Sequence, residues 1–145
     1  MASGSNIGIV EEWCARVWGR QEAAAIDELF VPKGTASGIG KAALIGPPEY
    51  RAFHAAMCAL VADPKLAVRD HIEAGDRLAA VATFSGTCRR TGKRVEAEGS
   101  MYFTFADGKI AACENHFEFM ELFEQLGLLP EDSFVTAMGG GVICG

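Results

Sequence analysis

The sequence predicts one small α+β domain, in which helices cover one side of a curved antiparallel sheet. Apolar residues recur at helical spacing in three segments before residue 64, whereas strands separated by turn signals follow from residue 66. Helices that precede a long meander are typical of folds whose helices gather on one side of the sheet. The 145 residues suit a single domain. We expect this domain over 1–130 and a Gly-rich, flexible tail over 131–145.

Three helices are expected before the sheet, over about 5–19, 21–30 and 48–63. Their apolar residues recur every three or four positions, and each helix ends near a glycine or a proline. Residues 31–47 contain four glycines and have no clear period. We therefore expect this connection to be mostly loop, with a short strand possible over 36–44.

Four consecutive antiparallel strands are expected over about 66–74, 78–88, 94–105 and 109–118. A glycine marks each turn between them, at Gly75, Gly92 and Gly108. The strands exceed the common length of five or six residues, which favours a bent or bulged sheet with a concave face. A short helix over 119–126 follows, and Gly127 provides its left-handed end.

Composition excludes several classes of function. The net charge is −6, and the densest basic cluster, over 89–94, surrounds a hairpin turn, so we expect no nucleic-acid partner. No apolar run approaches the roughly 18 residues of a membrane-spanning helix, so we expect no membrane partner. Met1–Gly8 lacks the pattern of a secretory leader, which favours the cytoplasm. The five cysteines are widely spaced and are expected to be reduced.

Three ionisable residues alternate along the last expected strand. Glu114, His116 and Glu118 would share one face, because strand residues two positions apart point the same way. Ile110 and Ala112 have the same parity, which favours the concave side. If helices cover that face, desolvation and like-charge proximity would raise a carboxyl pKa into the range of a general acid or base. If the face meets water, the alternation describes a solvated strand.

Aromatic and methionine side chains are candidates for the wall of an apolar cavity, although core packing explains most of them as well. The substrate-binding candidates are Trp13, Phe53, Met57, Met101, Phe103 and Glu114. His54 and His71 are expected to be surface or hydrogen-bonded histidines. The sequence has no phosphate-binding loop, dinucleotide fingerprint or paired histidines at metal-binding spacing. We expect no cofactor and no metal.

Four short runs carry a family resemblance: Gly46–Phe53, Glu73–Leu78, Asp107–Ile110 and Gln125–Pro130. Together they resemble the SnoaL-like polyketide cyclases, which belong to the NTF2-like superfamily, over nearly the whole chain to Pro130. The resemblance implies an NTF2-like cone-shaped barrel, with three N-terminal helices and a short C-terminal helix over a curved antiparallel sheet. It also implies a hydrophobic small-molecule ligand and a homodimer whose sheets pack by their outer faces.

The resemblance assigns the acid/base role to Glu118. In SnoaL-like cyclases an aspartate seven residues before the glutamine of Gln-Leu-Gly promotes an intramolecular aldol closure, and counting back from Gln125 reaches Glu118. Glutamate keeps the carboxyl group and adds one methylene. Glu114 occupies a position where the family commonly has tryptophan, and His116 a position that is usually apolar. Met101 replaces a polar pocket residue.

Three functional hypotheses follow. The first is a cofactor-independent enzyme that performs aldol cyclisation or isomerisation on a hydrophobic small molecule, with Glu118 moving the proton and His116 assisting it. The second is a non-catalytic module for small-molecule binding or dimerisation. The third is an epoxide hydrolase, in which Glu114 and Glu118 activate water and protonate the epoxide oxygen. Asn115 is the candidate for the supporting asparagine of such a site, although strand parity places it on the opposite face.

Overall fold

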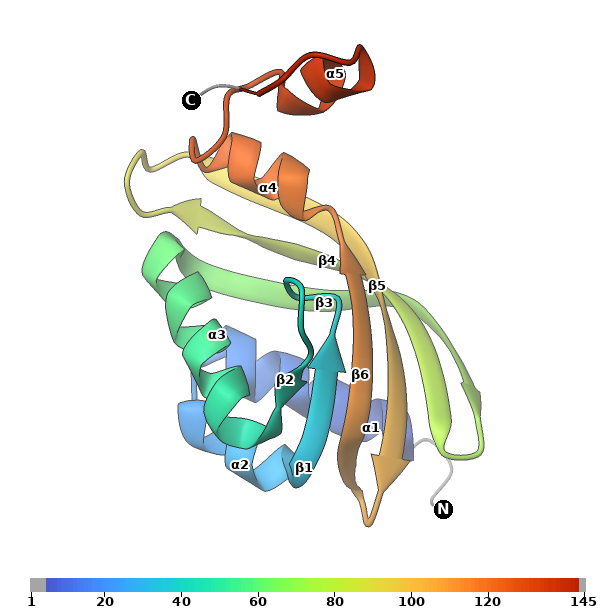
Figure 1. The fold of residues 1–145 in the computed structure, drawn as a ribbon. Coiled ribbons are helices and arrows are strands. Elements are labelled where there is room, and N and C mark those ends of the chain that lie inside the picture. Colours follow the sequence, from blue (N-terminus) through green and yellow to red (C-terminus); the bar gives the residue numbers. More distant parts are fainter. Residues whose placement is uncertain (1–4, 144–145) are drawn as a thin grey trace.

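The fold is described by a computed structural model that covers residues 5–143 (Figure 1). In chain order its elements are α1 (Ser5–Trp13), the π-helical segment η1 (Cys14–Gly19), α2 (Ala23–Leu29), β1 (Phe30–Ser37), β2 (Leu44–Ile45), α3 (Gly46–Leu60), β3 (Val61–Ala74), β4 (Arg77–Cys88), β5 (Arg94–Ala106), β6 (Lys109–Phe117), α4 (Phe119–Gln125) and α5 (Ser133–Met138). Helices followed by a four-stranded antiparallel meander confirm the predicted α+β class.

The strands form one curved sheet in the order β2-β1-β6-β5-β4-β3. The predicted meander is β3 to β6, while β1 runs parallel to β6 and pairs antiparallel with β2. Within residues 5–143 the sheet stays open, and the N-terminal helices and α3 lie along its concave side (Figure 1). The core fills the space between them, and its largest fully buried side chains include Phe30, Phe103, Ile26, Leu78 and Ile110.

The expectation of a loop over 31–47 is wrong, because this segment contains β1 and β2. Gly34 is buried in β1, and a Cβ atom at this position would lie 2.6 Å from the ring of Phe30. This glycine therefore marks close packing within a strand rather than a flexible connection. The sequence of β1 shows no clear apolar period because several of its residues are small. Small residues allow β1 to pack closely against both β6 and α3.

The third helix is shorter than expected. It ends at Leu60, and Asp63 and Pro64 lie inside β3, where the pairing with β4 shifts between Ala62 and Lys65. Asp63 adopts a positive φ of 49°, consistent with a bulge. Proline is tolerated here because β3 is an edge strand, whose outer N–H groups have no ladder partner to lose.

The Gln125–Gly127 run attaches α4 to the sheet. Strand β5 continues beyond the end of β6, and the side chain of Gln125 takes the place of the missing neighbour. Its Oε1 accepts a hydrogen bond from the backbone N–H of Glu96, and its Nε2 donates to the carbonyl of Glu96, both at 2.8 Å. Leu126 is buried, and Gly127 has a φ of 77°, which confirms the predicted left-handed helix end.

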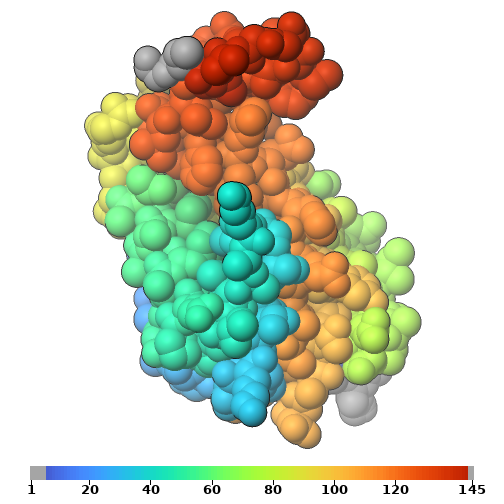
Figure 2. Space-filling model, in the orientation of Figure 1, coloured from blue at the N-terminus to red at the C-terminus, as the bar shows by residue number. Residues whose placement is uncertain are grey.

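The segment expected to be a flexible tail contains the short helix α5. Ser133 is buried at its start, and its hydroxyl donates to the carbonyl of Pro130 at 2.6 Å. The backbone N–H of Phe134 donates to the carboxylate of Glu124 at 3.2 Å, so α5 is attached to α4. These two helices form the orange and red end of the molecule in Figure 2. In the part of the chain described here, every helix is too short or too polar to cross a membrane.

Arg16 joins the N-terminal helices through three carboxylates. Its guanidinium donates to Glu12 at 2.9 Å and to Glu22 and Glu28 at 3.0 Å. These bonds lower the pKa of Glu28, and together with the stronger effect of Arg20 they lower that of Glu22. A lowered folded-state pKa stabilises the fold above the unfolded pKa of 4.5, and this stabilisation is lost as pH falls through the folded value.

We expect Arg16→Met to lower the urea midpoint at about pH 7, with a difference from the wild type that shrinks toward about pH 3. As pH falls through the lowered folded-state pKa values of Glu22 and Glu28, their carboxylates become protonated in the folded protein and the two proteins differ less. Urea unfolding at several pH values measures this. Lys41→Met, at an exposed position, is the control and should change little. A difference between Arg16→Met and wild type that stays constant with pH would contradict the prediction.

Candidate ligand-binding site

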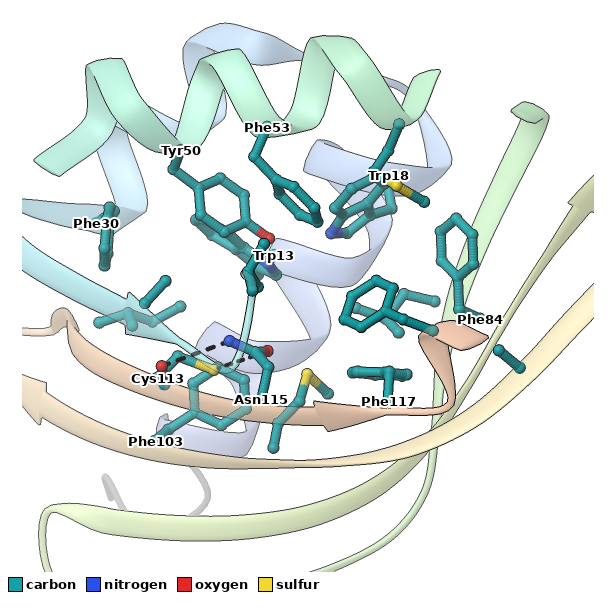
Figure 3. A pocket seen from close by; sticks show the side chains of 18 of the residues that line it. Trp13, Trp18, Phe30, Tyr50, Phe53, Phe84, Phe103, Cys113, Asn115 and Phe117 are labelled. Atoms are coloured by element: carbon teal, nitrogen blue, oxygen red, sulfur yellow. Dashed lines mark hydrogen bonds between the residues drawn. The ribbon is translucent and has the colours of Figure 1, made fainter. Parts of the chain in front are cut away.

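An aromatic cavity lies between the concave face of the sheet and the helices (Figure 3). The cavity has a volume of about 60 Å³. The lining is almost entirely apolar. Five of the expected substrate-binding residues lie in its wall, namely Trp13, Phe53, Met57, Met101 and Phe103. Their contact with a substrate remains a prediction.

Edge-to-face contacts fix the aromatic rings of the helical side. The ring of Tyr50 in α3 lies 5.1 Å from that of Trp13 and 5.5 Å from that of Phe53. Trp18 in η1 lies 6.2 Å from Phe53 and 5.5 Å from Phe84 in β4. Such contacts restrict ring rotation, so the helices present a rigid wall to the sheet.

Four lining residues are only half-buried: Ile39, Phe53, Phe117 and Phe119. They come from the β1–β2 connection, from α3 and from the junction of β6 with α4. Partial exposure of residues that also line the cavity locates its mouth between these three segments. A ligand would therefore reach the cavity between α3 and the start of α4.

The expected orientation of the polar residues on β6 is wrong. Opposite β5, Ala112 pairs with Thr104 and Ile110 pairs with Phe105, so Ala111 is an extra residue that bulges from the ladder. The bulge reverses the alternation: Ile110 points inward, and after it the odd-numbered residues point inward instead. Cys113, Asn115 and Phe117 therefore line the cavity, whereas Glu114 and His116 are exposed on the outer face.

Glu118 directly follows β6 and is absent from the cavity lining. It caps the start of α4, and its backbone N–H donates to the carbonyl of Glu98 at 3.0 Å. Its side chain is exposed, but the flanking Phe117 and Phe119 both line the cavity. The catalytic role assigned to Glu118 and His116 remains a prediction. The two do not meet in the cavity, since His116 lies in a shallow groove of the outer sheet face.

Asn115 is the polar lining residue that parity reasoning placed on the wrong side. It is 8% exposed, and its Nδ2 donates to the carbonyl of Ser37 at 3.0 Å, which ties β6 to β1. Its Oδ1 accepts from the thiol of Cys113 at 3.4 Å. Burial raises the pKa of Cys113, so this thiol is neutral at physiological pH and is not an activated nucleophile.

The remaining histidines stand apart from the cavity lining. His54 is buried behind it, and its Nε2 donates to the carbonyl of Val17 at 2.6 Å. His71 is exposed on β3. Among the residues that the structure describes, no three His, Cys, Asp or Glu side chains are grouped to hold a metal ion. The chemical character of the site is therefore that of an apolar cavity with a few polar atoms.

Comparisons with known proteins agree with this architecture. The family model described as SnoaL-like domain matches residues 10–113. A candidate SnoaL-like polyketide cyclase from Jannaschia sp. CCS1 has a TM-score of 0.76 at 18% identity, covering 87% of this chain and 94% of its own. No curated protein matches the sequence.

Two further solved structures carry small molecules. A protein of ketosteroid isomerase-like fold from Catenulispora acidiphila DSM 44928, in complex with trimethylamine, has a TM-score of 0.73 at 18% identity, covering 82% of this chain and 92% of its own. TerC, co-crystallised with polyporic acid, has a TM-score of 0.73 at 22% identity, covering 85% of this chain and 98% of its own. At these identities the likeness concerns the fold, and it confirms the expected architecture.

Proposed function

Because the chain belongs to the SnoaL-like domain family, we propose that it binds a hydrophobic small molecule in the aromatic cavity. The observation that carries this proposal is the cavity itself, whose wall is apolar and whose mouth is lined by half-buried aromatic rings. Ligand sites are typically such largely apolar concavities with a few oriented polar groups. The small molecules bound to structurally similar proteins, polyporic acid in TerC among them, are consistent with it.

A cavity-filling substitution tests the proposal. Ala97 lines the cavity, and Ala97→Phe should fill it and weaken binding of tetralin, a small bicyclic hydrocarbon, at least about tenfold. The only tryptophans in the chain, Trp13 and Trp18, lie in the wall, so their two indole N–H signals in ¹⁵N NMR report tetralin binding. Ala106→Phe, at an exposed position at the end of the same strand β5, is the matched control and should leave binding unchanged. Equal tetralin affinity in both variants would reject the cavity as the site.

Acid/base turnover of the bound molecule is the second candidate function, of aldol-cyclisation or isomerisation type and without a cofactor. The observation that favours it is that Glu118 lies between Phe117 and Phe119, two half-buried residues of the cavity lining, although its own side chain is exposed and outside that lining. From there its carboxylate is a candidate to remove a proton from a carbon next to a carbonyl group and to return it. A purely binding module is its rival, supported by the apolar lining. Hydrolysis of an epoxide is less well supported, since Glu114 and Asn115 lie on opposite faces.

Deuterium exchange separates turnover from binding alone. If Glu118 transfers protons, the protein should accelerate exchange at the carbon next to the carbonyl of 1-tetralone in D₂O, and Glu118→Gln should slow this exchange about 100-fold or more. Proton NMR measures the loss of the signal. His116→Gln should leave the rate unchanged, because His116 lies on the outer face. Binding of 1-tetralone without accelerated exchange would favour the binding module.

The homodimer expected from the family has a candidate interface on the outer sheet face. Ile72 is 76% exposed there, and Val81 and Tyr102 are also exposed apolar residues on neighbouring strands. We expect light scattering to give twice the monomer mass for the wild type and the monomer mass for Ile72→Lys, because a desolvated ammonium group would disfavour the contact. Val135→Lys, on α5, is the control and should remain dimeric. A wild-type monomer would rule this interface out.

A further inference from the structure

Trp18 contributes an unpaired hydrogen-bond donor to the cavity wall. Among the buried side-chain nitrogen and oxygen atoms of residues 5–143, only Nε1 of Trp18 has no hydrogen-bond partner. The side chain is 4% exposed and lines the cavity. A buried N–H group without an acceptor destabilises a fold, and such groups are rare in native proteins. Its location in a cavity wall suggests an acceptor that arrives with a ligand.

The neighbours of Trp18 hold its N–H in a fixed direction. Its ring lies 4.8 Å from that of His54 and 5.5 Å from that of Phe84, both in edge-to-face geometry. His54 is itself fixed by its bond to the carbonyl of Val17. Figure 3 shows the indole nitrogen directed into the cavity, toward the hydroxyl of Tyr50. The donor is therefore preorganised, and an acceptor placed there would not need to reorient the ring.

Tyr50 supplies a second donor at the same place. Its ring extends from α3, and its hydroxyl faces the indole nitrogen of Trp18 (Figure 3). The two groups do not meet hydrogen-bond geometry. Burial raises the pKa of Tyr50. The hydroxyl is consequently neutral and free to donate. On the sheet side, the amide of Asn115 is already committed to Ser37 and Cys113.

We propose that the Trp18 indole N–H and the Tyr50 hydroxyl form a subsite for one ligand oxygen, the carbonyl oxygen of a hydrophobic ketone or the phenolic oxygen of an aromatic ring. Two neighbouring donors match the two lone pairs of such an oxygen. The rest of the wall is apolar and accommodates the hydrocarbon part of the ligand. The subsite selects oxygenated ring compounds over hydrocarbons of the same shape. This inference rests on the proposed function, because it requires a ligand in the cavity.

A matched pair of probes tests the subsite, 1-tetralone with its carbonyl group and tetralin without it. The readout is the ratio of their dissociation constants, because comparing ratios between variants cancels the different hydrophobicities of the probes. Trp18→Phe and Tyr50→Phe should each reduce the preference for 1-tetralone about three- to tenfold, the value of one hydrogen bond. Leu122→Val changes the apolar wall on the α4 side without removing a donor and should leave the ratio unchanged.

The wild-type protein gives an independent readout. Binding of 1-tetralone should move the Trp18 indole proton downfield beyond any shift that tetralin causes, since only the ketone accepts its hydrogen bond. If neither probe binds, the proposed function and the subsite both fail. If both bind, but the ratio is the same in all variants and no downfield shift appears, the subsite alone is overturned. Should Trp18→Phe not fold, Tyr50→Phe and the wild-type spectrum decide.

Discussion

Gly38→Ala should destabilise the protein by about 3–5 kcal/mol, the range of the most disruptive single substitutions. Gly38 follows β1 with a φ of 81°, and a Cβ atom there would lie 1.7 Å from the backbone oxygen of Asn115. The obstacle is backbone, so no side-chain rotation relieves it, and β1 must move away from β6. This movement also breaks the bond from Asn115 to Ser37, which holds the cavity wall together.

Gly40→Ala is the matched control, since Gly40 has nearly the same φ of 82° and nothing within 4 Å of an added Cβ. The Gly40→Ala protein should lose only the stability that left-handed backbone strain costs, about 1–2 kcal/mol. Urea unfolding of both variants separates backbone strain from close approach. Equal losses would contradict the contact between Gly38 and Asn115.

Gly99→Ala should cost about 1–3 kcal/mol and should weaken tetralin binding as well. Gly99 in β5 pairs with Phe117 in β6, and a Cβ atom there would lie 2.3 Å from the Phe117 ring. The ring lies over the glycine and lines the cavity mouth, so the added methyl group must displace it. Urea unfolding and a tetralin titration measure the two effects.

A double variant identifies the cause of that loss. In the Gly99→Ala/Phe117→Leu protein the smaller side chain at position 117 leaves room for the methyl group. The combined loss of unfolding free energy should therefore be smaller than the sum of the single losses by about 1 kcal/mol. As a comparison, Gly8→Ala places a methyl group in α1 with nothing within 4 Å and should stabilise the helix by roughly 0.5–1 kcal/mol. If the losses of unfolding free energy at positions 99 and 117 simply add, the position of the Phe117 ring does not depend on Gly99.

The sequence predicts the meander well because its signals are local. Gly75, Gly92 and Gly108 all have positive φ in the turns where they were expected, and Gly127 ends α4 in the same way. Strand β1 has no such signal, because its pairing with β6 is set by residues far away in the chain. Alternating hydrophobicity locates strands only where one face is clearly polar, and the small residues of β1 hide that contrast.

The candidate site was predictable in part. The aromatic residues of the helices predict the cavity wall. The single extra residue at Ala111, in contrast, reverses which residues of β6 point inward and brings Asn115 into the cavity lining. A bulge of one residue leaves no mark on composition or spacing, so parity alone assigns the wrong face beyond it. The donor of Trp18 is likewise invisible in sequence, because its unpaired state depends on the packing around it.

The parallel pairing of β1 with β6 has a consequence for how the protein acquires its cavity. It brings Phe30 opposite Ile110, eighty positions along the chain, whereas the hairpins of the meander join near neighbours. Closing so long a loop costs entropy that local pairing does not, so we expect the hairpins to form first and this contact to form late in folding. On this expectation the cavity is completed in a late folding step, and partial unfolding that detaches β1 should open it while the meander persists.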